Sequence, residues 1–180
     1  MKKAKKHTKK HSTKGFSLIE LLIVVAIILI IAAIAIPNLM RSRIAANEAS
    51  AVASVRTLNT AEITYSTTYP INFNGDTGGF ATLTQLAGSC STTVPPTSST
   101  ACLVDNALAN AVSTTQLKSG YYFLITLPQV GDYVIAGQPG SPGTTGVRGF
   151  CSVTDGVVRY EPAATGMYTT DAACTALTAL

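Results

Sequence analysis

The chain has 180 residues, of which 47% are hydrophobic and only 12% are charged, and this length suits one ordinary domain with an additional segment. Its net charge of +4 would fit a nucleic-acid-binding protein, but seven of the 13 Lys and Arg residues precede residue 15. The remainder carries six basic and nine acidic residues, so the basicity belongs to a leader and no nucleic-acid partner is predicted. Both histidines, His7 and His11, lie in that leader. A chain cleaved after it lacks the residue that most often transfers protons near neutral pH.

An apolar segment, FSLIELLIVVAIILIIAAIAI, occupies residues 16–36, and its only charge is Glu20. At 1.5 Å per residue a helix of this length spans roughly 32 Å, which is enough to cross the core of a bilayer. Seven lysines precede the segment and only Arg41 and Arg43 follow it closely. This bias predicts a cytoplasmic amino terminus and an exported remainder.

Three interpretations of the apolar segment compete. A secretory signal would be cleaved after a site such as Ala33-Ile34-Ala35, but its apolar stretch is normally only about 7 to 15 residues long. A plain membrane anchor explains the length and gives Glu20 no purpose. Cleavage at the basic-to-apolar boundary, after Gly15, would remove the lysines and retain the helix. We favour this third interpretation.

Residues 14–40 closely resemble the type IV pilin and pseudopilin family, most of all a type IVa pilin. The resemblance rests on the basic leader, Gly15, Phe16, Glu20, the apolar run and Pro37, which match the class III prepilin signal. It implies that a prepilin peptidase cuts between Gly15 and Phe16 and methylates the new amine of Phe16. It also implies that Glu20 is recognised by the terminal amine of a neighbouring subunit.

Physical chemistry supplies a reason for Glu20. An unpaired carboxylate is unfavourable in a dry bundle of apolar helices, and a positive amine on a neighbour would relieve that cost. Glu20 would thereby set the stagger between subunits. Pro37 removes a backbone donor and is expected to kink or break the helix there, and the resemblance implies local unwinding at this point in a filament.

The predicted organisation has four parts: a basic leader (1–15), a hydrophobic transmembrane and assembly helix (16–37), an amphipathic half of the same helix (38–69) and a globular head (70–180). In the amphipathic half, apolar side chains recur at mostly three- or four-residue spacing and predict the face that packs on a sheet; they are Ile44, Val52, Val55, Leu58 and Ile63. The polar positions predict a solvated face; they are Arg41, Arg43, Asn47, Glu48, Arg56, Asn59 and Glu62.

All four cysteines follow the membrane-type segment, namely Cys90, Cys102, Cys151 and Cys174. An even number of cysteines in an exported segment fits disulfides, and the absence of CxxC spacing argues against zinc or redox sites. Four cysteines allow three pairings, of which we prefer the local one, Cys90 with Cys102 and Cys151 with Cys174.

The head is predicted to place an antiparallel sheet of about four strands against the amphipathic half-helix, in an α+β, pilin-like fold. The runs at residues 121–128 and 132–137 are typical of strands, and Asp155-Gly156 between two apolar runs predicts a hairpin. Residues 71–120 are expected to form an irregular connection that includes a Ser, Thr and Pro tract between Cys90 and Cys102. The glycine-rich residues 137–149 lack the GK[ST] ending of a phosphate loop and are expected to be a mobile loop.

These features predict a structural subunit that assembles into a helical homo-oligomeric filament, with no catalytic residue, cofactor or metal. The resemblance implies a peptidase/methyltransferase, an inner-membrane assembly platform and an ATPase as partners, and a bacterial inner-membrane location before assembly into an extracellular pilus. The adhesion, motility and secretion roles of such filaments are not distinguished by the sequence. Two alternatives stay open: a pseudopilin of a type II secretion system, and an exported, membrane-anchored binding module.

Overall fold

The computed structural model describes residues 15–70, 79–88, 90 and 94–180. The predicted leader up to residue 14, the turn-rich residues 71–78 and residues 91–93 of the Ser/Thr tract lie outside the described residues. The chain divides into two units, Met1–Leu39 and Met40–Leu180. Helix α1 (Leu18–Thr68) contributes to both.

In the first unit, α1 carries the apolar run of the sequence, and Pro37 lies inside the helix. Of the two outcomes expected at Pro37, a kink or a break, the break is therefore excluded, because the helix continues through this residue. Proline cannot donate the backbone bond to the preceding turn, but this loss affects one position and the flanking residues remain in helical conformation.

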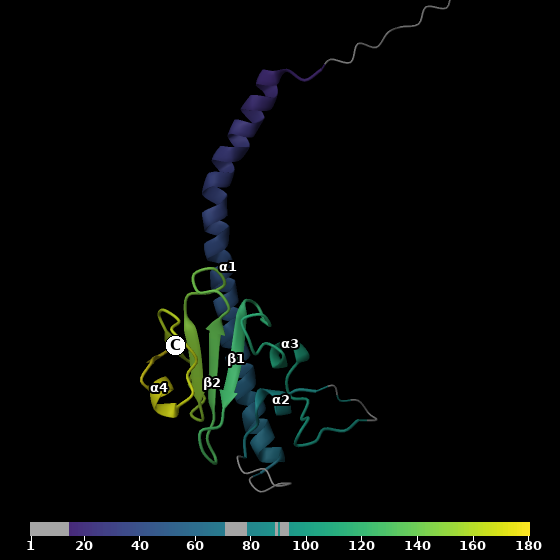
Figure 1. Cartoon of the computed structure of the whole chain (residues 1–180), viewed down its shortest axis with the longest axis vertical. Coiled ribbons are helices and arrows are strands. Elements are labelled where there is room, and N and C mark those ends of the chain that lie inside the picture. The colour runs from purple at the N-terminus through teal and green to yellow at the C-terminus, as the bar shows by residue number, and fades with distance from the viewer. Residues whose placement is uncertain (1–14, 71–78, 89, 91–93) are drawn as a thin grey trace, which may run out of the picture. The chain divides into compact units, whose positions relative to one another are not determined.

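The second unit is an α+β head, as predicted, in which the helix packs on an antiparallel sheet (Figure 1). The sheet has five strands in the order β1-β2-β3-β4-β5, one more than expected, because two residues close to the carboxy terminus pair with β4. The strands are β1 (Tyr121–Thr126), β2 (Val134–Pro139), β3 (Gly149–Val153), β4 (Arg159–Glu161) and β5 (Thr178–Ala179). The short helices are α2 (Leu83–Leu86), α3 (Asn106–Ala109) and α4 (Asp171–Thr175).

Strand β2 is buried on both faces, because each face is covered by a different part of the head. On one face Val55 of α1 approaches Gly137, where an added Cβ would lie 2.9 Å from the Phe123 ring. On the other face Val134 packs with Cys151, Val153 and Cys174. Gly137 is therefore required by close packing rather than by an unusual backbone angle, and the predicted strand continues to Pro139.

The predicted hairpin at Asp155-Gly156 is confirmed between β3 and β4. Gly156 has a positive φ of 70°, which glycine adopts without the steric penalty of a side chain. Its N–H donates to the Val153 carbonyl at 2.9 Å, which closes the turn.

The segment between α1 and β1 contributes more to the core than its irregular sequence indicated. Leu86 of α2 and Leu108 of α3 are fully buried in the same cluster as Leu58 and Tyr65 of α1. Figure 1 places α2 and α3 beside β1, on the opposite side of the sheet from α4. Four-residue helices give no periodic signal, because they contribute only one or two residues to a core.

Candidate processing and assembly site

The predicted cleavage junction, Gly15-Phe16, directly precedes α1. A Cβ built on Gly15 meets no described atom within 4 Å, and the Phe16 side chain is 85% exposed. Nothing in the described fold therefore requires glycine at position 15. A requirement for a small residue there would have to come from an external partner that contacts the junction.

Glu20 lies in the first turn of α1, where its carboxylate has a local partner. The backbone N–H of Ser17 donates to Glu20 Oε2 at 3.0 Å, and the Glu20 N–H donates to the Ser17 carbonyl at 3.1 Å. The first of these bonds is one half of a capping box. The role of Ser17 was not predicted from the sequence, although the S-x-x-E spacing before an apolar run is the signature of this motif. The bond holds the carboxylate at the backbone N–H of Ser17, the residue that follows Phe16, whose nitrogen would become the terminal amine after cleavage.

The apolar half of α1 leaves its surface unburied. From Leu18 to Ile36, the exposed fraction of the large apolar side chains ranges from 47% at Val25 to 80% at Leu18. By length and composition, α1 can cross a membrane, and it alone passes this test in the part of the chain that the structure describes. An apolar surface of this extent is stable only when lipid or other protein covers it.

Glu48 follows a different pattern from Glu20, because it is buried in the head. Its Oε1 accepts the backbone N–H groups of Val147 and Arg148 at 2.9 and 3.1 Å, and Arg148 Nε donates to Oε2 at 2.7 Å. Burial alone would raise the pKa of Glu48, but these backbone and guanidinium bonds together hold it below its ordinary value. Asn47 adds a bond from Nδ2 to the Thr145 carbonyl at 2.8 Å.

The expectation of a loop over all of residues 137–149 is wrong in its extent, and the part that is a loop is bonded to α1. The first three of these residues belong to β2 and the last to β3, and Glu48 and Asn47 bind the carboxy-terminal part of the segment. A glycine-rich sequence leaves the conformation of a loop open, and here bonds from a distant helix determine it.

Glu62 is fully buried, and the Ala81 N–H donates to its Oε2 at 2.9 Å. Among the described residues, Oε1 has no hydrogen-bond partner. Burial raises the pKa of Glu62 to about 8, against the lowering effect of the Ala81 bond. The carboxyl group is consequently held mainly in its neutral form at pH 7.

Asn59 is also buried, and it connects α1 to two strand-region residues. Asn59 Nδ2 donates to Ser152 Oγ at 2.9 Å, and the Tyr133 hydroxyl donates to Asn59 Oδ1 at 3.3 Å. The prediction that Glu48, Asn59 and Glu62 are solvated is wrong. Specific partners in the head compensate for the burial of Glu48 and Asn59, whereas Glu62 has a described partner for only one of its carboxyl oxygens. The predicted packing position Ile63 is instead 55% exposed.

The cysteines form two disulfides in the head, Cys90–Cys102 and Cys151–Cys174, each with a Cα–Cα distance of 5.9 Å. The second joins β3 to α4. Neither lies in the unit that contains Glu20. Among the described residues, no group of three or more His, Cys, Asp or Glu side chains could hold a metal ion.

Comparison with known proteins identifies the amino-terminal motif. A family model described as "Prokaryotic N-terminal methylation motif" matches residues 10–36. Over 75 residues, the chain is 45% identical to the type IV wide pilus major component PilA4 of Thermus thermophilus. This match covers 42% of the chain and 54% of that relative, so the chain spans about half the length of the relative that it matches. No solved structure matches the chain.

The two matches confirm the resemblance recognised at residues 14–40. The chain carries the class III N-methylation motif of type IV pilin-like proteins, joined to a head with the α+β arrangement expected for such a protein.

Proposed function

We propose that the chain is a structural subunit of a type IV pilus. It is cut between Gly15 and Phe16, methylated on Phe16, and assembled into a helical filament through the segment 16–37. One observation carries the proposal: α1 begins with a long run of exposed apolar side chains and a single acid in its first turn, and this run lies within an N-methylation motif.

The driving force for assembly is the burial of the apolar half of α1 against copies of itself. Each Å² of apolar surface removed from water contributes roughly 25 cal/mol, although a helix that leaves lipid gains less because lipid already covers it. Contacts between different faces of identical subunits produce a closed ring only when the rotation from one subunit to the next closes on itself. Otherwise they produce a helical filament.

Glu20 would set the register of the subunits. In a dry bundle its carboxylate needs a partner more strongly than it does in water, and the bond from Ser17 supplies only one hydrogen bond to one oxygen. The positive amine of Phe16 on a neighbouring subunit supplies the missing charge. A stagger that brings the two groups together is then favoured over all others.

The cellular context of the proposal follows from the same segment. The lysine-rich leader keeps the amino terminus in the cytoplasm, and the head is exported across the bacterial inner membrane, where its cysteines are oxidised. A peptidase/methyltransferase acts on the chain, and an assembly platform and its ATPase act on the processed subunit. The role is structural, not enzymatic, and the similarity to a pilus major component supports this.

The direct test is intact mass and amino-terminal sequencing of filaments sheared from the native cells. We expect an amino terminus at methylated Phe16. A terminus at Ile36, or uncut Met1 in the membrane fraction, would contradict the proposal.

A paired variant tests the role of Glu20. Glu20→Gln keeps the size of the side chain and removes its charge, so we expect normal cleavage and at least tenfold less sheared filament. Asp171→Asn, a matched change in the first turn of α4, should leave the filament yield unchanged. Equal yields from the wild type and Glu20→Gln would exclude a register role for the carboxylate.

A further inference from the structure

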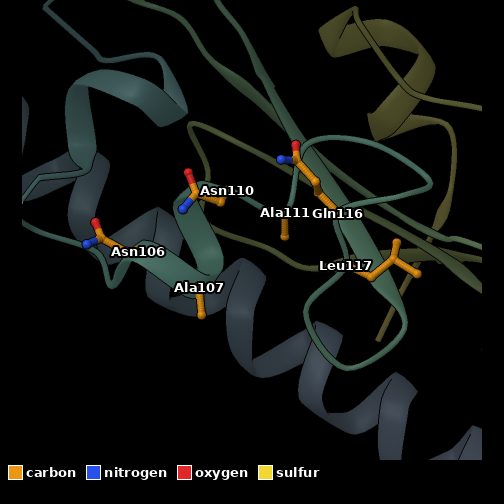
Figure 2. Close-up of a pocket in the computed structure, with 6 residues that line it drawn as sticks. All are labelled: Asn106, Ala107, Asn110, Ala111, Gln116 and Leu117. Atoms are coloured by element: carbon orange, nitrogen blue, oxygen red, sulfur yellow. The ribbon is translucent and has the colours of Figure 1, made fainter.

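The head contains an open pocket that the proposed filament function does not use. It has a volume of about 320 Å³ and lies between α3 and the turn that leads to β1 (Figure 2). Its lining consists of Asn106, Ala107, Asn110, Ala111, Gln116 and Leu117. The volume is at the lower end of the range for small-molecule sites.

The two walls of this pocket are held in place by bonds that do not involve the side chains of Asn110 and Gln116. The Asp105 side chain caps α3 by accepting the Leu108 N–H at 2.7 Å, and the Phe123 N–H of β1 donates to the Ala111 carbonyl at 2.7 Å. Lys118 Nζ contacts Asp105 Oδ2 at 3.0 Å and so links the second wall to the first. A pocket with fixed walls loses less conformational entropy when a ligand binds.

The chemistry of the lining is neutral and polar. Asn110 and Gln116 are exposed, and their carboxamides have no hydrogen-bond partner among the residues that the structure describes. Each carboxamide offers two N–H donors and one carbonyl acceptor. Figure 2 shows that they come from different walls, Asn110 at the end of α3 and Gln116 on the following turn.

Charge and apolar surface narrow the class of ligand further. None of the six lining residues is ionisable, and the nearby Asp105 and Lys118 neutralise one another. A charged ligand would lose hydration without gaining a counter-ion. Leu117, Ala107 and Ala111 add apolar surface beside the carboxamides.

We propose that this pocket binds a neutral saccharide of one or two units. Sugar hydroxyls donate and accept hydrogen bonds, as carboxamides do, and the C–H face of a pyranose ring can pack on Leu117. A peptide that adds to the edge of β1 fits less well, because the Ala111 carbonyl already occupies the Phe123 N–H. The proposal does not depend on the filament function.

The test uses the full chain, ¹⁵N-labelled and purified in lauryldimethylamine oxide, a detergent without a sugar headgroup. Galactose, N-acetylglucosamine and maltose are titrated while the side-chain amide resonances are recorded. We expect saturable shifts at Asn110 and Gln116 and none at Gln129, an exposed carboxamide in the β1–β2 connection. No shift with any of the three sugars, or equal shifts at Gln129, would overturn the proposal.

Two further ligands separate the neutral sugar from its competitors. Sialic acid tests a charged saccharide, and tetra-alanine tests a peptide. Each should shift the Asn110 and Gln116 resonances less than the best neutral sugar does. A larger shift with either ligand would overturn the assignment of ligand class.

Variants test the two carboxamides directly. The double variant Asn110→Ala, Gln116→Ala should retain the dispersed backbone spectrum of the wild type and bind the best sugar at least tenfold more weakly, whereas Gln129→Ala should bind it normally. Unchanged affinity in a folded double variant would contradict the proposal. If that variant fails to fold, the comparison of Asn110 and Gln116 with Gln129 in the wild type decides the question.

Discussion

The two halves of α1 both carry apolar side chains, but these are exposed in the first half and largely buried on one face of the second. Residues 18–36 expose every large apolar side chain and carry one acid, whose described partner is the neighbouring backbone. In the second half, Val55 and Leu58 are fully buried, as is Glu62. The difference shows that a segment can form a helix without its apolar side chains being buried within the same chain. The helix is continuous through both halves, but the surface that covers it comes from the head in one half and, in our proposal, from other subunits in the other half.

The largest expected effect comes from the same substitution made in each half. Leu58→Ala should lower the free energy of unfolding of the head by about 2 to 5 kcal/mol, because it leaves a cavity in a packed core. Leu22→Ala should change it by less than about 0.5 kcal/mol, because Leu22 is 62% exposed, while lowering the filament yield. Urea unfolding of the detergent-solubilised chain, followed by near-UV circular dichroism of its tyrosines, measures the effect of each substitution on the free energy of unfolding. Shearing filaments from cells measures the filament yield. Equal effects of the two substitutions on the free energy of unfolding would refute the proposal that only the second half of α1 stabilises the head.

The next expected effect concerns pH and the buried acid Glu62. Its pKa is about 8 in the folded head and about 4.5 ordinarily, so the folded state retains a proton that the unfolded chain releases. The contribution of Glu62 to the stability of the head should therefore be greatest below pH 4.5, fall as the pH rises from 4.5 to 8, and level off above pH 8.

Glu62→Gln tests this titration, because glutamine stays neutral and its carbonyl can still accept the Ala81 N–H. Relative to the wild type, the variant should be more stable at pH 8 by an amount on the order of 4 kcal/mol, and most of the gain should disappear near pH 4.5. Urea unfolding across this pH range provides the measurement. A gain that does not vary with pH would show that Glu62 is not the titrating group.

The smallest expected effect distinguishes Glu48 from Glu20. Glu48→Gln should lower the stability of the head at pH 7 by about 1 to 3 kcal/mol, because it weakens charge-assisted bonds to a partly buried arginine. The pKa of Glu48 is lowered in the folded state, so this contribution is present above pH 4.5 and is lost as the pH falls through the folded pKa.

Glu20→Gln is the matched control, and it should leave unfolding of the head unchanged at every pH. The same urea titrations, repeated between pH 3 and 7, test both variants. If Glu20→Gln destabilised the head as much as Glu48→Gln does, the two acids would not have separate roles.

Sequence patterns predicted the parts of the fold that rest on local chemistry. Turn residues and β-branched runs predicted strands at residues 121–128 and 132–137, which correspond to β1 and β2, and the hairpin at Asp155-Gly156, because these signals act over a few residues. The boundary between the two halves of α1 was visible for the same reason, since polar residues begin directly after Pro37.

Other features depended on partners that are distant in the chain. Glu48 receives its bonds from Val147 and Arg148, about 100 residues away. The helical periodicity around Glu48 contains no sign of these partners, and it therefore predicted a solvent-exposed side chain. Strand β5 has only two residues, and it exists because β4 offers an unpaired edge. At the amino terminus, the role of Ser17 could have been predicted, because the capping-box spacing is a purely local signal.

By itself, the sequence determined the amino-terminal motif, the apolar helix with its single acid, and the α+β class of the head. These depend on residue type, spacing and periodicity, which are properties of adjacent residues. Only the tertiary structure decided that Glu48, Asn59 and Glu62 are buried, that residues 137–149 are held by α1, and that two carboxamides face a neutral pocket. Such outcomes depend on which distant groups meet, and the free energy of a buried polar group is set by those partners rather than by its own segment.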